Sequence, residues 1–200
     1  MNMSVRKIFK INKGFTLAEV LITLVIVGVV AALTIPNIIY ETKKHEYSAR
    51  LKKFYSAMKQ ASLRSEVDNK GWSDWAIAES TSSRGLEVEQ NFMNTYLLPY
   101  VSFVKKESNK IYFNDGSSLQ CHKGDCMDFI FDVNGDKAPN QVGRDIFDFL
   151  YCKSQMQFVS YNAVTSRSAA LSNCASNPYT CSTLVMIDGW EFKKDYPYRL

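Results

Sequence analysis

The sequence has little of what enzyme active sites are usually built from. It contains two histidines, His45 and His122, among its 200 residues. Its five cysteines form no C-x-x-C pair, and no glycine-rich phosphate-binding loop or G-x-S-x-G nucleophile motif occurs. These absences leave catalysis without support, and we expect the chain not to be an enzyme.

Long apolar runs and net charge are also scarce over most of the chain. Only one stretch is long and apolar enough to cross a bilayer, which excludes a multispan membrane protein. Hydrophobic residues make up 46% and charged residues 22%, which excludes wholesale disorder. Of the 24 basic residues, four lie in residues 1–14, where no acid occurs, and the other 20 balance the 20 acidic residues. The body of the protein therefore has no net charge that would favour nucleic acid.

The one long apolar run follows this basic leader. No charged residue occurs in the 21 residues from Val20 to Tyr40, close to the ~20 that a membrane-spanning helix needs. The positive-inside rule places residues 1–14 in the cytoplasm and everything after about residue 41 outside. A secretory signal peptide and a permanent single-pass anchor both fit this pattern. Neither explains Glu19 within the apolar segment or Pro36 well inside the helical run, because both disfavour an ordinary membrane helix.

The residues around Glu19 resemble a known processing motif. The segment from Lys13 to Leu21, KGFTLAEVL, is similar to the prepilin cleavage and methylation motif of type IV pilins and type II secretion pseudopilins. The resemblance implies that a membrane enzyme, the prepilin peptidase, cuts after Gly14 and N-methylates Phe15. Counted from Phe15, Glu19 is the fifth residue and Pro36 the twenty-second, as in many members of that family.

This resemblance, which covers residues 1 to about 67, implies a structural function. The chain would be a minor pilin or pseudopilin that assembles through its N-terminal helix. The amine freed at Phe15 becomes buried in the fibre, where an unpaired charge is costly, so Glu19 of one subunit is expected to pair with the Phe15 amine of a neighbour. The implied partners are the prepilin peptidase, other subunits and an inner-membrane assembly platform.

The implied location is the inner membrane, with the head outside, and then a periplasmic or extracellular filament. Two alternative functions stay open. One is a competence-type pilin that takes up DNA, which the balanced charge of the body does not support. The other is a single-pass anchored binding protein that never polymerises.

The rest of the chain indicates an α+β head packed on the long helix. Apolar residues recur at spacings of four and three from Tyr47 to Ala61, which predicts an amphipathic helix that ends near residues 68–71. A small antiparallel sheet would complete a pilin-like lollipop. The expected segments are a cleaved leader, a transmembrane and assembly half of the first helix, and an extracytoplasmic head: residues 1–14, 15–41 and 42–200.

Shorter elements are expected further along the chain. A loop over residues 71–85 leads to a second helix from Leu86 to Leu98, which Pro99 stops. Residues 110–119 indicate a β-hairpin, because Asp115-Gly116 favours the positive φ angles of a tight turn. Further strands are expected at four places: residues 126–133, 145–151, 157–164 and 183–187.

One loop of the head carries oxygen-bearing side chains at alternate positions. Asp132, Asn134 and Asp136 can converge on a hard cation, and Asp145 lies close behind them. The loop resembles the start of an EF-hand loop but lacks that motif's invariant glycine and bidentate glutamate. Calcium is therefore the one cofactor that the sequence suggests, in a looser site. The alternative is a set of turn caps, in which Asp and Asn side chains bond nearby backbone amides.

The five cysteines suit an oxidising compartment, in which four of them form two disulfides. We expect the two bridges that close the shortest loops: Cys121–Cys126 and Cys174–Cys181. Cys152 would then stay free. The alternatives are five buried thiols, or a zinc ion with His122 as an extra ligand, which the cysteine spacings do not favour.

Overall fold

The computed structural model describes residues 14–71, 75, 85–123, 126–152, 155 and 157–200. The chain divides into two compact units, Met1–Glu41 and Thr42–Leu200. Residues 1–13 of the expected leader and most of the expected loop over residues 71–85 lie outside the described residues.

The first helix, α1, spans Leu17–Asp68. Within Thr42–Leu200 it buries one stripe of side chains at spacings of three and four residues, which is the period of an α-helix. The stripe consists of Tyr47, Leu51, Phe54, Met58, Ala61, Ser62 and Ser65. α1 ends where Lys70 takes a φ of 64° and Asn69 Nδ2 donates to the carbonyl of Ser65 at 3.2 Å. The amphipathic helix and its end are as the sequence predicts.

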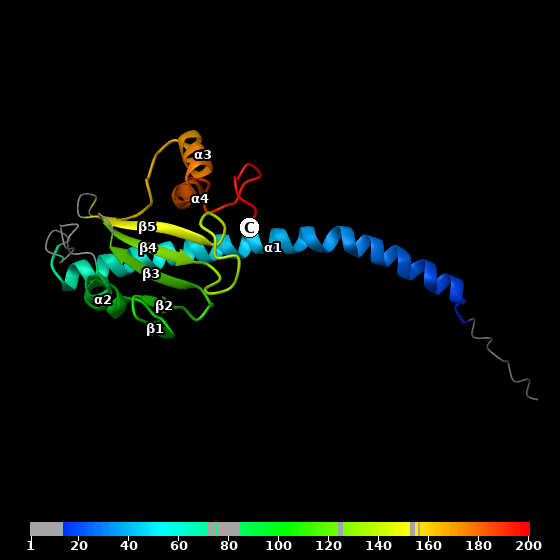
Figure 1. Cartoon of the computed structure of the whole chain (residues 1–200), viewed down its shortest axis with the longest axis horizontal. Coiled ribbons are helices and arrows are strands. Elements are labelled where there is room, and N and C mark those ends of the chain that lie inside the picture. Colours follow the sequence, from blue (N-terminus) through cyan, green and yellow to red (C-terminus); the bar gives the residue numbers. More distant parts are fainter. Residues whose placement is uncertain (1–13, 72–74, 76–84, 124–125, 153–154, 156) are drawn as a thin grey trace, which may run out of the picture. The chain divides into compact units, whose positions relative to one another are not determined.

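The head contains a six-stranded antiparallel sheet whose strands follow one another in chain order, with the part of α1 from Thr42 to Asp68 running along it (Figure 1). The strands are β1 (Lys105–Glu107), β2 (Lys110–Tyr112), β3 (Ser118–Lys123), β4 (Met127–Asp132), β5 (Ile146–Cys152) and β6 (Gln157–Ser160). Each pairs with the next, for example with Leu119 opposite Phe131 between β3 and β4. A long N-terminal helix followed by an antiparallel sheet confirms the α+β architecture expected from the sequence.

The hairpin between β2 and β3 forms where the sequence predicts it. Gly116 takes a φ of +83°, a conformation that favours glycine. Phe113 N donates to the carbonyl of Ser117 at 2.9 Å, and Asp115 Oδ1 accepts from Ser117 N at 3.2 Å. The carboxylate thus satisfies a backbone donor that the tight turn leaves without a strand partner.

The second expected helix is present but changes type along its length. It consists of the α-helix α2 (Leu86–Phe92), a π-helix (Met93–Leu97) and a 3₁₀-helix (Leu98–Tyr100). Pro99 lies in the last segment, as expected from its inability to continue an α-helix. Trp75 is buried between the π-helix and β5, with its ring centroid 4.6 Å from that of Tyr96 and 5.1 Å from that of Tyr151.

Aromatic rings fill the space between α1 and the sheet. The Phe54 ring on α1 stacks on Phe131 of β4 at a centroid distance of 3.9 Å and lies 5.4 Å from Phe149 of β5. Phe149 in turn stacks on Phe158 of β6 at 5.5 Å. Alternate residues of β4 and β5 supply these rings, because successive side chains of a strand point to opposite faces. This inner face is the core of the head.

The C-terminal region corrects one prediction. Residues 183–187, expected as a strand, lie in a helix, α4 (Cys181–Ile187). An unpredicted helix, α3 (Arg167–Ser176), and a short 3₁₀ turn (Pro178–Thr180) precede it. A short apolar run such as that in α4 fits a strand and a buried helix equally well, and tertiary contacts decide between the two. In the fold this segment packs beside β5, where Ser182 Oγ donates to the carbonyl of Asp148 at 2.5 Å.

The last strand is also shorter than predicted, since β6 ends at Ser160 and not at residue 164. Asn162, which follows, has a φ of 51° and cannot continue a strand.

A mutation at Phe54 tests the aromatic core. Replacing Phe54 by Ala should lower the free energy of unfolding of the head by about 3–5 kcal/mol, because it removes a ring that is buried against the sheet. Urea denaturation of the full chain in detergent, followed by tryptophan fluorescence, measures the loss. Lys52→Ala, at an exposed position of the same helix, should change stability by less than about 0.5 kcal/mol. Equal losses in the two variants would contradict this account of the core.

Asp148 is a buried carboxylate on the face of β5 opposite the aromatic core. Its side chain is 5% exposed, and its Oδ1 atom has no hydrogen-bond partner among the described residues. Burial, with a further contribution from the nearby Asp128 charge, raises the pKa of Asp148 from 3.8 to about 8. The folded head therefore holds this proton more tightly than the unfolded chain does.

The pH dependence of stability should reflect Asp148. Its stabilising contribution is complete below the unfolded pKa and is lost as the pH rises towards about 8. Asp148→Asn, which stays neutral, should be more stable than wild type at pH values above that range, and the difference should shrink in acid. Urea titrations across this range measure the effect. Parallel pH profiles for the two proteins would refute it.

Candidate processing and assembly site

The expected cleavage position lies directly ahead of α1. Gly14 and Phe15 precede the helix, and the Phe15 side chain is 88% exposed. A Cβ atom added to Gly14 would meet no other atom within 4 Å. The described part of the fold therefore places no steric requirement for glycine at this position.

Glu19 closes the N-terminus of α1 in a reciprocal cap with Thr16. Glu19 Oε2 accepts from the Thr16 backbone N at 2.8 Å and from its hydroxyl at 2.9 Å. Thr16 Oγ1 accepts from Glu19 N at 3.2 Å. This is a capping box, which satisfies backbone donors that a helix start leaves free. The pattern Thr-x-x-Glu signals this role in the sequence, although only an assembly role was expected for Glu19.

The apolar part of α1 presents an uncovered surface. From Gly14 to Ile39 every residue is exposed except Ala31, which is half-buried. Within the described ranges, α1 is the helix long and apolar enough to cross a membrane. A contiguous apolar surface of this extent requires lipid or protein to cover it.

Pro36 lies inside α1, and the helix continues on both sides of it. Because proline has no backbone N–H, the carbonyl of Ala32 lacks the hydrogen bond that residue 36 would normally donate. The loosening of the helix that the sequence predicts at this point stays a prediction.

The predicted calcium ligands separate into two groups in the structure. Asp145 is fully buried and caps a turn: Oδ2 accepts from Asn140 N at 2.9 Å and Oδ1 from Gln141 N at 2.7 Å. Asn134 Nδ2 also donates to Asp145 Oδ2, at 3.3 Å. Asp136 instead lies outside this group, and its Oδ1 pairs with Lys110 Nζ at 2.6 Å.

Asp132 lies at the other end of the same turn. Its Oδ1 accepts from Asn134 N at 3.1 Å. With its amide nitrogen turned inward, Asn140 donates at 3.1 Å to Asp132 Oδ2 and to the carbonyls of Gly135 and Lys137. Burial raises the pKa of Asp132 to about 6, with the Asp145 charge adding to the rise. The loop is thus closed by side-chain caps, which is the alternative weighed for it.

Across the described residues no group of three or more His, Cys, Asp or Glu side chains is placed to hold a metal ion. One feature still fits an oxygen-rich site, since Asn134 Oδ1 is buried without a hydrogen-bond partner among those residues. Calcium binding at this loop stays a prediction.

One of the two predicted disulfides is present, and the other is replaced by a different pairing. The Cys174–Cys181 bridge is present, and the second bridge joins Cys126 to Cys152. The predicted Cys121–Cys126 bridge is wrong because Cys121 points into the core on β3, fully buried, while Cys126 lies opposite the end of β5. Pairing across the sheet brings the two Cα atoms of the Cys126–Cys152 bridge to 4.7 Å, although 26 positions separate them in sequence.

His122 does not join a metal site with these cysteines. Its Nδ1 lies 3.2 Å from Glu89 Oε1, and the neighbouring Cys121 points to the opposite face of β3. Burial raises the pKa of the Cys121 thiol well above its ordinary value, so it stays protonated and unreactive.

Comparison with known proteins agrees with the site at the start of α1. Residues 9–35 match the prokaryotic N-terminal methylation motif. The chain is also 43% identical over 68 residues to the type IV major pilin protein PilA of Myxococcus xanthus (strain DK1622). The N-terminal region is therefore that of a type IV pilin-like protein.

The remainder of the chain defines its family. Residues 37–200 match a family of unknown function, DUF6613, and the chain belongs to that family. The similarity to the Myxococcus pilin covers 32% of this chain and 29% of the relative, so the chain matches less than a third of that pilin's length. No solved structure matches the chain.

A thermal melt tests the calcium prediction. Calcium that binds only the folded head should stabilise it by about 2.7 kcal/mol at roughly a hundredfold excess over Kd, which corresponds to several degrees in melting temperature. Melting of the full chain in detergent with calcium, and then with chelator, measures the shift. Asp132→Asn keeps an oxygen for the cap but removes the charge, and it should abolish the shift. A parent chain indifferent to calcium would leave turn capping as the whole role of this loop.

Proposed function

We propose that the chain is a minor pilin or pseudopilin, a structural subunit of a type IV pilus or a type II secretion pseudopilus. Residues 1–14 are a leader that the prepilin peptidase removes. Residues 15–41 first anchor the subunit in the inner membrane and then pack in the filament. Residues 42–200 form a head outside the membrane. The chain performs mechanical work of assembly and is not an enzyme.

The exposed apolar surface that begins at the cleavage motif carries this proposal. It starts at Phe15 and continues along α1 to Ile39, so the same residues that a bilayer covers first can be covered later by the helices of other subunits. Gly14, for which the fold has no steric need, is explained by a peptidase that accepts no side chain there. An inner-membrane platform that draws subunits from the bilayer is the further partner that such a transfer requires.

Glu19 has a second role beyond its cap. Removal of the leader creates a charged amine at Phe15, one residue before the Thr16 that Glu19 caps. In a filament of packed apolar helices, this amine needs a carboxylate partner, since a buried unpaired charge costs several kcal/mol. Glu19 of a neighbouring subunit supplies it and sets the axial register of assembly.

The alternatives explain less. A secretory signal peptide or a non-polymerising anchor leaves Gly14 and the spacing from Phe15 to Glu19 without a purpose. DNA uptake lacks support from charge, because basic and acidic residues balance after residue 14.

Processing is the first prediction. Mass spectrometry of the chain from its native membrane should find Phe15 as the first residue, carrying an N-methyl group. Gly14→Leu should accumulate as uncut precursor, because a branched side chain clashes in a peptidase site shaped for glycine. A mature N-terminus near Ala32 would indicate ordinary signal peptidase and refute the proposal.

Assembly is the second prediction, and the cap provides its control. Glu19→Gln keeps an acceptor for Thr16, since glutamine also serves in capping boxes, but it removes the charge. It should still be cut, yet enter filaments at least about 100-fold less, because leaving a buried charge unpaired costs about 3–5 kcal/mol. Thr16→Ala removes the cap and keeps the charge, and it should assemble normally. Quantification of sheared filaments measures both. Equal defects in the two variants would assign Glu19 to capping alone.

A further inference from the structure

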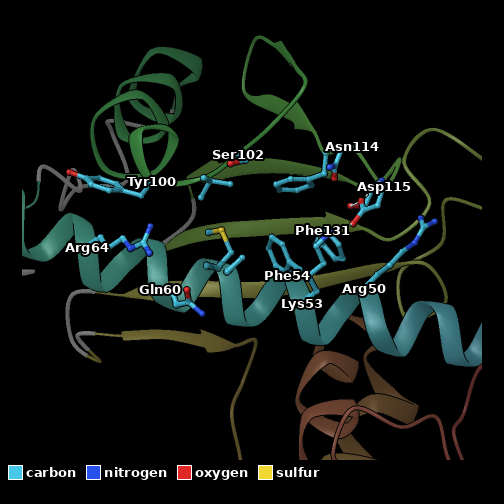
Figure 2. A pocket seen from close by; sticks show the side chains of 15 residues that line it. Arg50, Lys53, Phe54, Gln60, Arg64, Tyr100, Ser102, Asn114, Asp115 and Phe131 are labelled. Carbon is cyan, nitrogen blue, oxygen red and sulfur yellow. Dashed lines mark hydrogen bonds and ion pairs between the residues drawn. The ribbon is translucent and has the colours of Figure 1, made fainter.

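The head contains a groove that none of the residues of the processing and assembly site lines. It lies between α1 and the segment that carries Tyr100 and Ser102, and the β2–β3 turn closes one end (Figure 2). Its volume is about 300 Å³, at the lower end of the range for small-molecule sites in proteins.

The floor of the groove is apolar and largely aromatic. Phe54, Met58 and Phe131 form it, and Phe113 adds a half-buried ring whose centroid lies 6.3 Å from those of Phe54 and Phe131. Flat apolar bodies pack well against such ring edges and faces, because aromatic groups favour offset and edge-to-face arrangements.

The rim of the groove is cationic. Two of its three cations already have partners: Arg50 donates to Glu46 at 2.5 Å and to the carbonyl of Val133 at 2.6 Å, and Lys53 pairs with Asp115 at 2.9 Å. The third, Arg64, has no ion-pair or hydrogen-bond partner within the described parts of the chain. The unneutralised charge of the rim is therefore positive and lies at the Arg64 end.

The spacing along α1 gives the size of a fitting ligand. Ala57 and Arg64, both on the groove, are seven residues apart, which is two helical turns or about 10 Å. Figure 2 shows Arg64 and Gln60 at one end of the row of side chains, with Phe54 of α1 and Phe131 of β4 farther from that end. An anionic head at Arg64 would thus place an apolar body of two fused rings over Ala57 and Met58.

We propose that this groove binds small aromatic carboxylates, with the carboxylate on Arg64 and the rings on the floor formed by Phe54, Met58 and Phe131. Charge complementarity and the aromatic floor together favour this class over neutral or cationic molecules. The side chains of Gln60 and Ser102, which line the groove and have no partner within the described parts of the chain, are available to bond the remaining carboxylate oxygen.

Methyl NMR of the full chain in detergent tests the proposal, with the methionine methyl groups labelled with ¹³C. 2-Naphthoate is the probe, and its rings should shift the Met58 signal in a saturable manner by their ring currents. Met127 and Met186, which do not line the groove, should not respond. Neutral 2-naphthalenemethanol has nearly the same shape without the charge, and it should bind more weakly by about fivefold, the upper end of the range for one exposed ion pair.

Matched variants locate the two halves of the site. Arg64→Gln should weaken 2-naphthoate by about fivefold and leave the neutral analogue unaffected. Lys52→Gln removes an equal charge from an exposed position of α1 outside the groove and should change neither. Ala57→Phe keeps every charge but fills the groove, and it should abolish binding. Because Ala57 and Arg64 are exposed, neither Ala57→Phe nor Arg64→Gln should change the melting temperature, which checks that both variants fold.

Three results would overturn the proposal. The first is a Met58 signal that does not move with 2-naphthoate. The second is equal binding of the charged and neutral probes. The third is the same weakening by Lys52→Gln as by Arg64→Gln, which would reduce the effect to the overall charge of the helix.

Discussion

The head depends on the contact between one face of α1 and the inner face of the sheet. Phe54 is at its centre, stacked on Phe131 and close to Phe149, so that one ring on the helix touches two neighbouring strands. Strands β4 and β5 can present those rings only in their observed register, because a slip of one residue would turn every ring to the opposite face. The helix and the sheet therefore fix each other.

The two parts of α1 satisfy opposite demands. The head-side part hides one stripe of side chains and exposes the rest, whereas the N-terminal part from Phe15 to Ile39 hides almost nothing. A surface that is so apolar requires lipid or protein to cover it. At the start of this surface, Thr16 and Glu19 satisfy backbone donors of the helix end within the chain itself.

Two disulfides and the loop between β4 and β5 stabilise parts of the head outside the aromatic core. The Cys126–Cys152 bridge ties the start of β4 to the end of β5, and Cys174–Cys181 ties α3 to α4. In the loop after β4, Asp145 receives backbone donors that would otherwise be buried without partners. Gly135 is required there, because a Cβ would lie 2.5 Å from the carbonyl oxygen of Gly116 in the neighbouring turn.

The sequence alone determined whatever depends on near neighbours in the chain. The period from Tyr47 to Ala61, the Asp115-Gly116 turn and the motif from Gly14 to Glu19 each have a local signature, and the helix, the hairpin and the N-terminal class followed from them. Only the tertiary structure decided the rest. Residues 183–187 form a helix because of what they pack against, Cys126 bonds to Cys152 because antiparallel pairing brings distant cysteines together, and the rings and cations of the groove come from segments far apart in the sequence. Such contacts are set by sheet register and side-chain burial, which no local pattern encodes.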